Sequence, residues 1–355
     1  MLSFTVYKGS PDGTPVKSTT SKPRQLTGDQ VLLKVLASGV CGTDMVLGHE
    51  GVGEVQAVGP EVRALKPGQV VGWGYQTGAC GLCAACLSGD ETYCAERQMY
   101  GGAGASPEQG SFATHAVWRE AFLHALPEGL SPADAAPLQC GGATVFTALL
   151  GVRPTDTVGV LGVGGLGHLA IQFAAKMGCR VVVLSGSDRK RDEAMRLGGH
   201  RFVATSTLAD KKKKNKENKD DDEEEDMWEL DRLLVTTSAL PDWDVIMPMM
   251  AVRSRIVPLS VGGRDLVVPY APVLLRGVVI QSALVATRAV HRDMLAFAAR
   301  HGVRPVVETF PLDEHGAKEA MDRLDKGQVH FRAVLLPRGE HEVEKEEEKA
   351  GKHKI

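Results

Sequence analysis

The chain has 355 residues, of which 43% are hydrophobic and 5% aromatic, and its formal net charge is −3. This length exceeds one ordinary domain and predicts two, each large enough to bury a core. A nearly neutral body offers no basic surface to nucleic acid or anionic lipid, and no apolar run is long enough to span a membrane. The N-terminus lacks the regions of a secretory signal, so we expect a cytoplasmic protein.

The first part of the chain consists of short strands broken by turns. Val31–Ser38 alternates between apolar and polar residues, and Gly51–Val58 forms a second strand that ends at Gly59-Pro60. We therefore expect an all-β opening domain, closer to a barrel than to a sandwich.

The pattern then changes to alternating strands and helices. Ser131 and Pro132 form a helix start, and they are followed by an apolar strand at Thr157–Leu161, a helix at His168–Met177 and a strand at Val181–Leu184. This order predicts an α/β fold with a doubly wound parallel sheet. Further strands are expected at Leu233–Val235, Arg255–Val261 and Val278–Ser282.

These elements predict two domains, the first of which is interrupted by the second. Residues 1–153 would form a catalytic domain with a cysteine-rich lobe, 154–288 a nucleotide-binding domain, and 289–338 a return to the catalytic domain. The returning segment is expected to contain helices at Met294–Arg300 and Gly316–Leu324 and a strand at Arg332–Leu336. Two segments rich in both signs of charge, 211–226 and the tail 339–355, are predicted to be disordered.

Four cysteines, Cys80, Cys83, Cys86 and Cys94, lie within fifteen residues. In a reducing compartment this spacing favours metal thiolates over disulfides, and four thiolates close a tetrahedral shell around a structural zinc ion. A nucleic-acid zinc ribbon would have similar spacing, but no Lys or Arg lies between the first and the last of these cysteines. The sequence therefore predicts a structural zinc lobe.

A glycine-rich turn lies between the strand at Thr157–Leu161 and the helix that follows. It contains Gly162, Gly164, Gly165 and Gly167. Glycines in this context permit a tight turn and let the backbone approach a pyrophosphate at the helix N-terminus. The motif predicts a dinucleotide cofactor.

The end of the second strand of the parallel sheet indicates which dinucleotide binds. An NAD site needs an acidic side chain at the strand tip, whereas this tip carries Ser185 and Ser187, followed by Arg189 and Lys190. Hydroxyls and cations suit a 2′-phosphate, so we predict NADP(H). We expect Asp188 to cap the following helix rather than to bind a ribose.

A second metal site is suggested by Cys41, His49 and Cys140. Two thiolates and one imidazole leave an open fourth position, which is typical of a catalytic zinc ion. The ion would act as a Lewis acid on a carbonyl or an alkoxide. By spacing alone, a buried Cys140 without a metal is the alternative.

Together these residues resemble the zinc-containing medium-chain dehydrogenases, most closely the NADP-dependent group of the cinnamyl-alcohol-dehydrogenase type. The likeness runs from Val31 to Leu336 and rests on Cys41-Gly-Thr-Asp44, Gly48-His-Glu-Gly51, the four-cysteine lobe, Cys140 with Thr144, and Gly162–Gly167. It implies a GroES-like β-barrel catalytic domain and a Rossmann domain. It also implies that Cys41, His49 and Cys140 hold the catalytic zinc.

The resemblance assigns further roles near this zinc. It places Glu50 beside the ion, lets Thr43 pass the alcohol proton outward, and makes Asp44 the partner that orients His49. Positions that line the cofactor in this family are matched by Thr144, Thr237 and Ser282.

One departure from the family lies between Cys41 and His49, which are separated by only seven residues. The family has a longer link, with a histidine five places after the cysteine that continues the proton relay; this chain has Val46 there. The deletion could reflect a true variant, a degenerate enzyme or a wrongly spliced gene. We expect it to weaken activity.

The sequence thus predicts a zinc-dependent NADP(H) alcohol dehydrogenase or aldehyde reductase with two Zn²⁺ per chain. Its substrate would be a small alcohol or aldehyde, and the family implies a homodimer or a homotetramer. One alternative is a catalytically impaired relative that binds NADPH and structural zinc. The other is a zinc-ribbon interaction protein.

Overall fold

A computed structural model describes residues 1–9, 14–42, 48–100, 110–207, 228–261 and 265–339. The chain divides into two compact units, one made of Met1–Ala143 with Ala286–Ile355 and the other of Thr144–Val285. In the described parts, no helix is both long and apolar enough to cross a membrane. The charged segment 211–226 and nearly all of the tail 339–355 lie outside the described residues.

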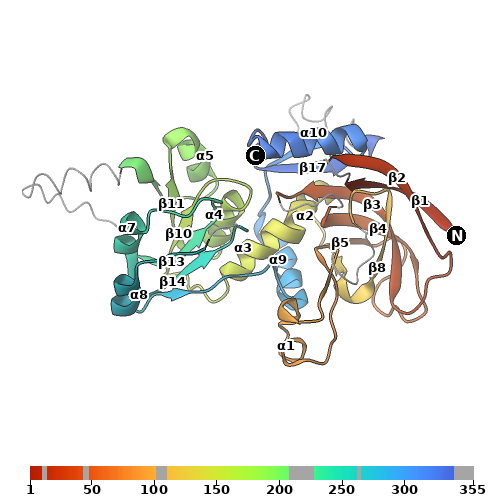
Figure 1. Ribbon diagram of the computed structural model, residues 1–355, viewed down its shortest axis with the longest axis horizontal. Coiled ribbons are helices and arrows are strands. Elements are labelled where there is room, and N and C mark those ends of the chain that lie inside the picture. The colour runs from red at the N-terminus through yellow and green to blue at the C-terminus, as the bar shows by residue number, and fades with distance from the viewer. Residues whose placement is uncertain (10–13, 43–47, 101–109, 208–227, 262–264, 340–355) are drawn as a thin grey trace, which may run out of the picture. The chain divides into compact units, whose positions relative to one another are not determined.

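The first unit is built on a seven-stranded sheet in the order β16-β17-β3-β4-β5-β9, with β8 also paired to β3 (Figure 1). Its strands are β1 (Leu2–Gly9), β2 (Pro15–Lys22), β3 (Gln30–Val40), β4 (Glu50–Val58), β5 (Val70–Trp73), β6 (Gln76–Gly78), β7 (Gln98–Met99), β8 (His115–Arg119), β9 (His124–Ala125), β16 (Val307–Pro311) and β17 (Arg332–Leu336). Its helices are α1 (Ala84–Leu87), α2 (Pro132–Pro137), α9 (Arg288–His301) and α10 (Glu314–Asp325). A π-helical turn, Leu138–Gly142, follows α2 and is called the π-turn below.

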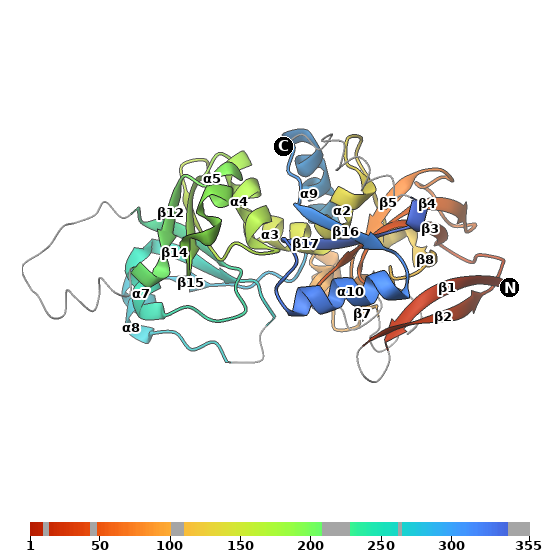
Figure 2. The same ribbon diagram turned by 90° about the horizontal axis from the view of Figure 1, so that it is seen from above.

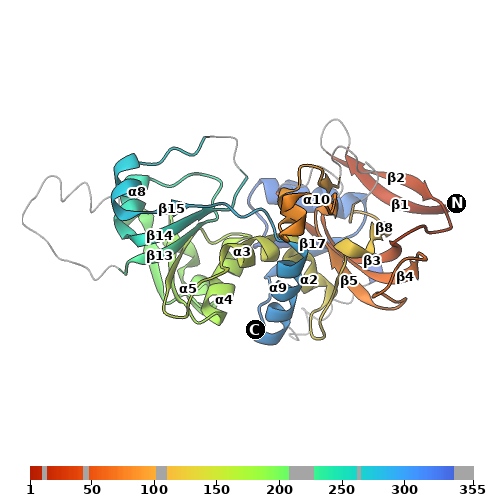
Figure 3. The same ribbon diagram turned by 90° about the horizontal axis from the view of Figure 1, so that it is seen from below.

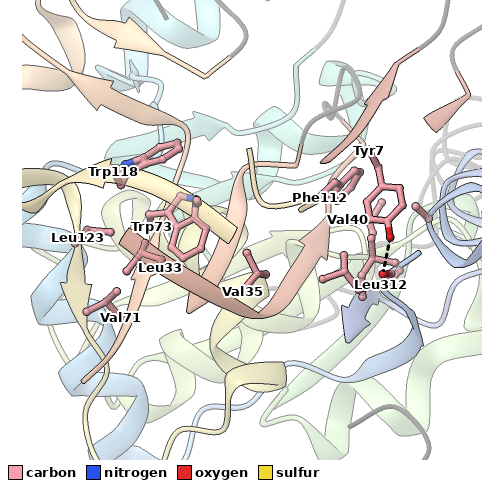
Figure 4. Packing of buried hydrophobic residues seen from close by; sticks show 14 of the residues in the cluster. Tyr7, Leu33, Val35, Val40, Val71, Trp73, Phe112, Trp118, Leu123 and Leu312 are labelled. Atoms are coloured by element: carbon pink, nitrogen blue, oxygen red, sulfur yellow. Dashed lines mark hydrogen bonds between the residues drawn. The ribbon is translucent and has the colours of Figure 1, made fainter. Parts of the chain in front are cut away.

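The core of this unit lies against the sheet and is rich in aromatic residues (Figure 4). Leu33 of β3 and Trp73 of β5 are fully buried, and the Trp73 ring lies 5.9 Å from that of Trp118. The buried hydroxyl of Tyr7 donates a hydrogen bond of 3.2 Å to the carbonyl of Leu312, which links the N-terminal strand to the returning segment. Residues from both ends of the chain therefore complete one core.

The second unit contains a six-stranded, fully parallel sheet in the order β12-β11-β10-β13-β14-β15. Its strands are β10 (Thr157–Leu161), β11 (Arg180–Ser185), β12 (Arg201–Ala204), β13 (Leu230–Val235), β14 (Met250–Pro258) and β15 (Val279–Ile280). Its helices are α3 (Ala143–Ala148), α4 (Gly167–Lys176), α5 (Arg191–Arg196), α7 (Trp243–Ile246) and α8 (Tyr270–Arg276). Helices α4 and α5 cover one face, and α7 and α8 cover the other, as Figures 2 and 3 show. The predicted doubly wound sheet is present.

Most elements lie where the sequence predicted them, but several ends differ. β14 begins five residues before the expected Arg255 and ends three residues before the expected Val261, and β13 begins three residues before the expected Leu233. The strand expected at Val278–Ser282 is only two residues long, because β15 pairs on one side alone, at the edge of the sheet. The helix expected at Met294–Arg300 begins earlier, at Arg288, because the Thr287 side chain caps it by accepting the N–H of Val290.

Candidate metal centres and nucleotide site

The four-cysteine lobe lies between β6 and β7, and its sulfur atoms are all within 4.8 Å of one another. The Sγ atom of Cys80 is 3.9 Å from that of Cys86 and 3.6 Å from that of Cys94. A tetrahedral zinc site with Zn–S bonds of about 2.3 Å has sulfur–sulfur edges of about 3.8 Å. The cluster therefore fits a closed zinc shell that is completed by Cys83.

Backbone groups of the lobe already stabilise a thiolate. The N–H groups of Leu82 and Cys83 donate to the Sγ of Cys80 at 3.5 and 3.3 Å. These two bonds lower the pKa of Cys80 to about 7. A metal thiolate at this position would keep both donors satisfied.

The second cluster brings together Cys41, His49, Glu50 and Cys140, with one ligand atom of each within 4.8 Å of the others. Cys41 follows β3 and His49 precedes β4, and these strands are antiparallel neighbours in which Gly39 pairs with Glu50. The short link therefore still places both side chains at the same end of the strand pair. The π-turn supplies Cys140.

The hydrogen bond from the Cys140 thiol is the main cause of an uneven pair of pKa values. It lowers the pKa of Cys41, with help from His49, and it raises the pKa of Cys140. Cys41 is thus the more acidic thiol of the pair. Two sulfur ligands and a buried imidazole match the donor set of a catalytic zinc ion.

Glu50 lies beside this cluster and is fully buried. Its carboxylate forms an ion pair with Arg332 of β17. The Nη2 atom of Arg332 contacts both carboxylate oxygens, and its distance to Oε2 is 2.6 Å. Burial raises the pKa of Glu50, and the guanidinium opposes that shift. The charge on Glu50 is therefore neutralised by Arg332 and does not require a metal.

The sequence analysis did not predict the side chain that contacts His49, which is Tyr100. The Nδ1 atom of His49 is 3.2 Å from the hydroxyl of Tyr100, and the two rings are 5.1 Å apart. Because Nδ1 contacts this hydroxyl, a metal ion at the cluster would bind His49 through Nε2. The predicted orienting residue Asp44 and the predicted proton acceptor Thr43 lie outside the described residues.

The glycine-rich turn closes tightly on itself. Gly162 has φ +99°, and a Cβ on Gly167 would lie 2.0 Å from the Gly162 carbonyl oxygen. A Cβ on Gly164 would meet no atom of the described residues within 4 Å. Gly165 lies between them, and α4 begins at Gly167. The turn thus has a packed side and an open side, as a pyrophosphate cradle needs.

The strand tip after β11 also has the predicted groups. Ser185 and Ser187 are half-buried, and the exposed Arg189 donates to the Ser187 hydroxyl at 3.4 Å. The Lys190 ammonium donates to the carbonyl of Val163 in the glycine-rich turn at 2.8 Å. Lys190 therefore links the two parts of the predicted cofactor site.

The prediction that Asp188 caps α5 was wrong. The residue preceding α5 is Lys190, and no side chain caps this helix. Asp188 instead forms an ion pair with Arg191, whose guanidinium lies 4.7 Å from the Phe202 ring centre. This exposed carboxylate therefore has a cation of its own segment as its partner.

Three other predicted cofactor residues lie in the second unit. Thr144 is buried in α3, the Thr237 hydroxyl donates to the Ala239 carbonyl at 2.7 Å, and the Ser282 hydroxyl donates to the Pro258 carbonyl at 3.1 Å. Two of these hydroxyls thus hold loops that follow the strands of the sheet. Their contacts with a cofactor stay a prediction.

The sequence and the fold of this chain are similar to those of known dehydrogenases. Residues 27–128 match the alcohol dehydrogenase GroES-like domain and residues 165–300 the zinc-binding dehydrogenase domain. The chain is 32% identical to aldehyde reductase AdhA of Synechocystis sp., over 88% of this chain and 93% of that protein. It is 32% identical to NADP-dependent alcohol dehydrogenase 6 of Saccharomyces cerevisiae, over 90% and 92%. A solved cinnamyl alcohol dehydrogenase of Sorghum bicolor superposes with a TM-score of 0.84 at 30% identity, over 94% and 97%.

The chain therefore belongs to the alcohol dehydrogenase family of zinc-binding dehydrogenases. It is a zinc-binding oxidoreductase of the alcohol dehydrogenase type. The predicted fold class, a GroES-like domain combined with a Rossmann-type parallel sheet, is confirmed.

Proposed function

We propose that this enzyme transfers hydride between NADP(H) and a small alcohol or aldehyde at a zinc ion held by Cys41, His49 and Cys140. The observation that carries the proposal is the convergence of these three side chains, together with Glu50, from three segments of the chain. Zinc supplies Lewis acidity toward the substrate oxygen when it is bound, and the nicotinamide supplies or accepts the hydride.

The residues of the chain prepare this site in distinct ways. Cys41 is the more acidic thiol of the cysteine pair, and Tyr100 holds the ring of His49 through Nδ1. The ion pair between Glu50 and Arg332 adds no net charge, so the two thiolates of the shell balance a divalent cation. We propose that Thr43 takes the alcohol proton, with Asp44 as a further partner of His49.

We also propose that the cofactor is NADP(H), bound across the glycine-rich turn and the β11 tip. Ser185, Ser187, Arg189 and Lys190 would receive the 2′-phosphate. Two facts support this preference: the yeast relative is named as NADP-dependent, and Asp188 is already paired. The proposed domains are a GroES-like domain at 1–153 with 289–338 and a nucleotide-binding domain at 154–288.

The structural zinc is proposed to bind Cys80, Cys83, Cys86 and Cys94. Its role is to fold the loop between β6 and β7, in which the described helix α1 is only four residues long. None of the residues of α1 is buried, so metal binding would fix the shape of this segment. None of the seven cysteines, all of which lie in the described residues, forms a disulfide, which fits the proposed cytoplasmic location.

We further propose that the enzyme is a homodimer formed through the edge of the parallel sheet. β15 ends this sheet, and exposed apolar side chains gather around it. They include Val267, Tyr270, Leu274, Leu275 and Val279. A second copy related by a two-fold axis would extend the sheet and cover the same patch on both subunits.

The test is NADPH oxidation against a panel of aliphatic and aromatic aldehydes, with zinc analysis of the same sample. Turnover with two zinc ions per chain is expected. Two zinc ions and tight NADPH binding without turnover would favour the catalytically impaired alternative and implicate the short link at Val46. The zinc-ribbon alternative has no support from relatives that match along nearly the whole chain.

A further inference from the structure

A buried polar network surrounds Gln139, the residue before Cys140. The Gln139 side chain is fully buried, and its Nε2 donates to the Ala135 carbonyl at 2.9 Å. Its Oε1 lies 2.9 Å from Nε2 of His291 in α9. The amide therefore has a partner on each side, one in the preceding helix and one on a distant helix.

These contacts fix the state of His291. Because the amide nitrogen of Gln139 donates to a carbonyl, its oxygen must accept, and Nε2 of His291 must carry the proton. Burial lowers the pKa of His291 to about 3, so the ring is neutral. His124 stacks on it with ring centres 4.0 Å apart and planes 13° apart. The ring is therefore held in one tautomer and one orientation.

The surrounding strands leave a space shaped for this amide. A Cβ on Gly72 would lie 2.3 Å from the carboxamide carbon of Gln139, and a Cβ on Gly74 would lie 2.9 Å from its backbone oxygen. Gly72 of β5 pairs with His124 of β9, so the strand pair supplies both the space and the stacking ring. A larger residue at Gly72 would therefore displace the Gln139 carboxamide, and one at Gly74 would press on the backbone of the π-turn.

Helix α9 is itself fixed at its first turn. The buried carboxylate of Glu91 accepts from the backbone N–H and the Nε of Arg288 at 2.8 and 2.9 Å. His291 lies one turn further along the same helix. The imidazole of His291 therefore belongs to a helix that Glu91 anchors independently of the hydrogen bond to Gln139.

We propose that His291 is a positioning residue for the Cys140 ligand, acting through Gln139. A π-helical turn has one extra residue and poorer hydrogen bonding than an α-helix, so it needs outside support to hold one shape. The Gln139–His291 bond supplies that support beside the thiol. This inference rests on the proposed zinc site, because it matters only if Cys140 binds a metal.

The experiment measures cobalt binding to the full chain after metal removal. Co²⁺ at a site with two sulfurs and one nitrogen absorbs differently from Co²⁺ at four sulfurs, so the two sites titrate separately. His291→Phe keeps the stacked ring but removes the N–H, whereas His291→Gln restores an amide N–H at a similar reach. Tyr7→Phe is the matched control, because it removes one buried hydrogen bond in the same unit, far along the chain from the cluster.

We expect His291→Phe to weaken cobalt binding at the three-ligand site by about tenfold to a hundredfold and to shift its absorption bands. His291→Gln should recover most of the affinity, and Tyr7→Phe should change neither quantity. If His291→Phe lowers only the melting temperature, as Tyr7→Phe does, the positioning role is refuted while the proposed function stands. If the wild-type chain binds cobalt only at four sulfurs, the proposed function fails and this inference fails with it.

Discussion

Alanine substitutions at two glycines of the glycine-rich turn, Gly167 and Gly164, should weaken NADPH binding for different reasons. In Gly167→Ala, the new Cβ would lie 2.0 Å from the Gly162 carbonyl oxygen, so the turn and α4 must separate by about 1 Å to restore even a close contact. Overpacking of this kind costs about 1–3 kcal/mol. In Gly164→Ala, the new Cβ has no neighbour within 4 Å among the described residues, so we expect its effect to fall on a pyrophosphate bound at the turn.

The two variants should therefore separate stability from binding. At about 3 °C per kcal/mol for a unit of this size, Gly167→Ala should lower the melting temperature by about 3–9 °C. Gly164→Ala should leave it nearly unchanged. Both should weaken NADPH binding at least tenfold, or about 1.4 kcal/mol, in a fluorescence titration. Normal NADPH affinity in Gly164→Ala would show that the cofactor does not lie on this turn.

Three further predictions address other parts of the account. Cys83→Ser should release one zinc ion and lower the melting temperature, because binding energy at a closed shell is folding energy; unchanged metal content would remove the structural zinc assignment. NADPH should bind at least tenfold more tightly than NADH, and Arg189→Ala should reduce that ratio toward one; equal dissociation constants in the wild type would show that the cations face elsewhere. Below about pH 6.5 the unfolded chain binds a proton at His291 that the folded chain, with a pKa of about 3 there, does not, so stability falls as pH drops through this window by about 1.4 kcal/mol per unit. Between pH 7.5 and pH 5.5 the melting temperature should therefore fall less in His291→Phe than in the wild type. An equal fall in both proteins would contradict the buried neutral ring.

Local patterns predicted most of the fold. β10 and β17 have the bounds that their apolar runs indicated, because a strand buried on both faces leaves a continuous apolar signal. The strand β2 has no such signal, since it is mostly polar, and it is held in place by pairing with β1 and by the bond from the Lys17 N–H to Glu314 of α10. Such tertiary support is invisible in a short window of sequence.

The two metal clusters differ in how much of each could be predicted from the sequence. Cysteine spacing alone identified the four-sulfur lobe, whereas the support of the second cluster comes from residues distant in sequence. Gln139 and His291 are 152 positions apart, and Glu50 and Arg332 are 282 apart. Buried histidines and arginines have no periodic signal, so only the folded chain shows that they meet. Tyr100 was missed for the same reason.

Isotope transfer tests the central claim, hydride transfer from NADPH to a carbonyl substrate, most directly. The purified enzyme is incubated with an aldehyde panel and NADPH that carries deuterium at both hydrogen positions of the nicotinamide C4, and the alcohols are analysed by mass spectrometry. The account predicts alcohols that carry one deuterium at the carbinol carbon, and predicts their loss when the three-ligand cluster is disrupted by Cys140→Ser. Absence of deuterated alcohol from every aldehyde, in protein that holds two zinc ions and binds NADPH, would contradict it.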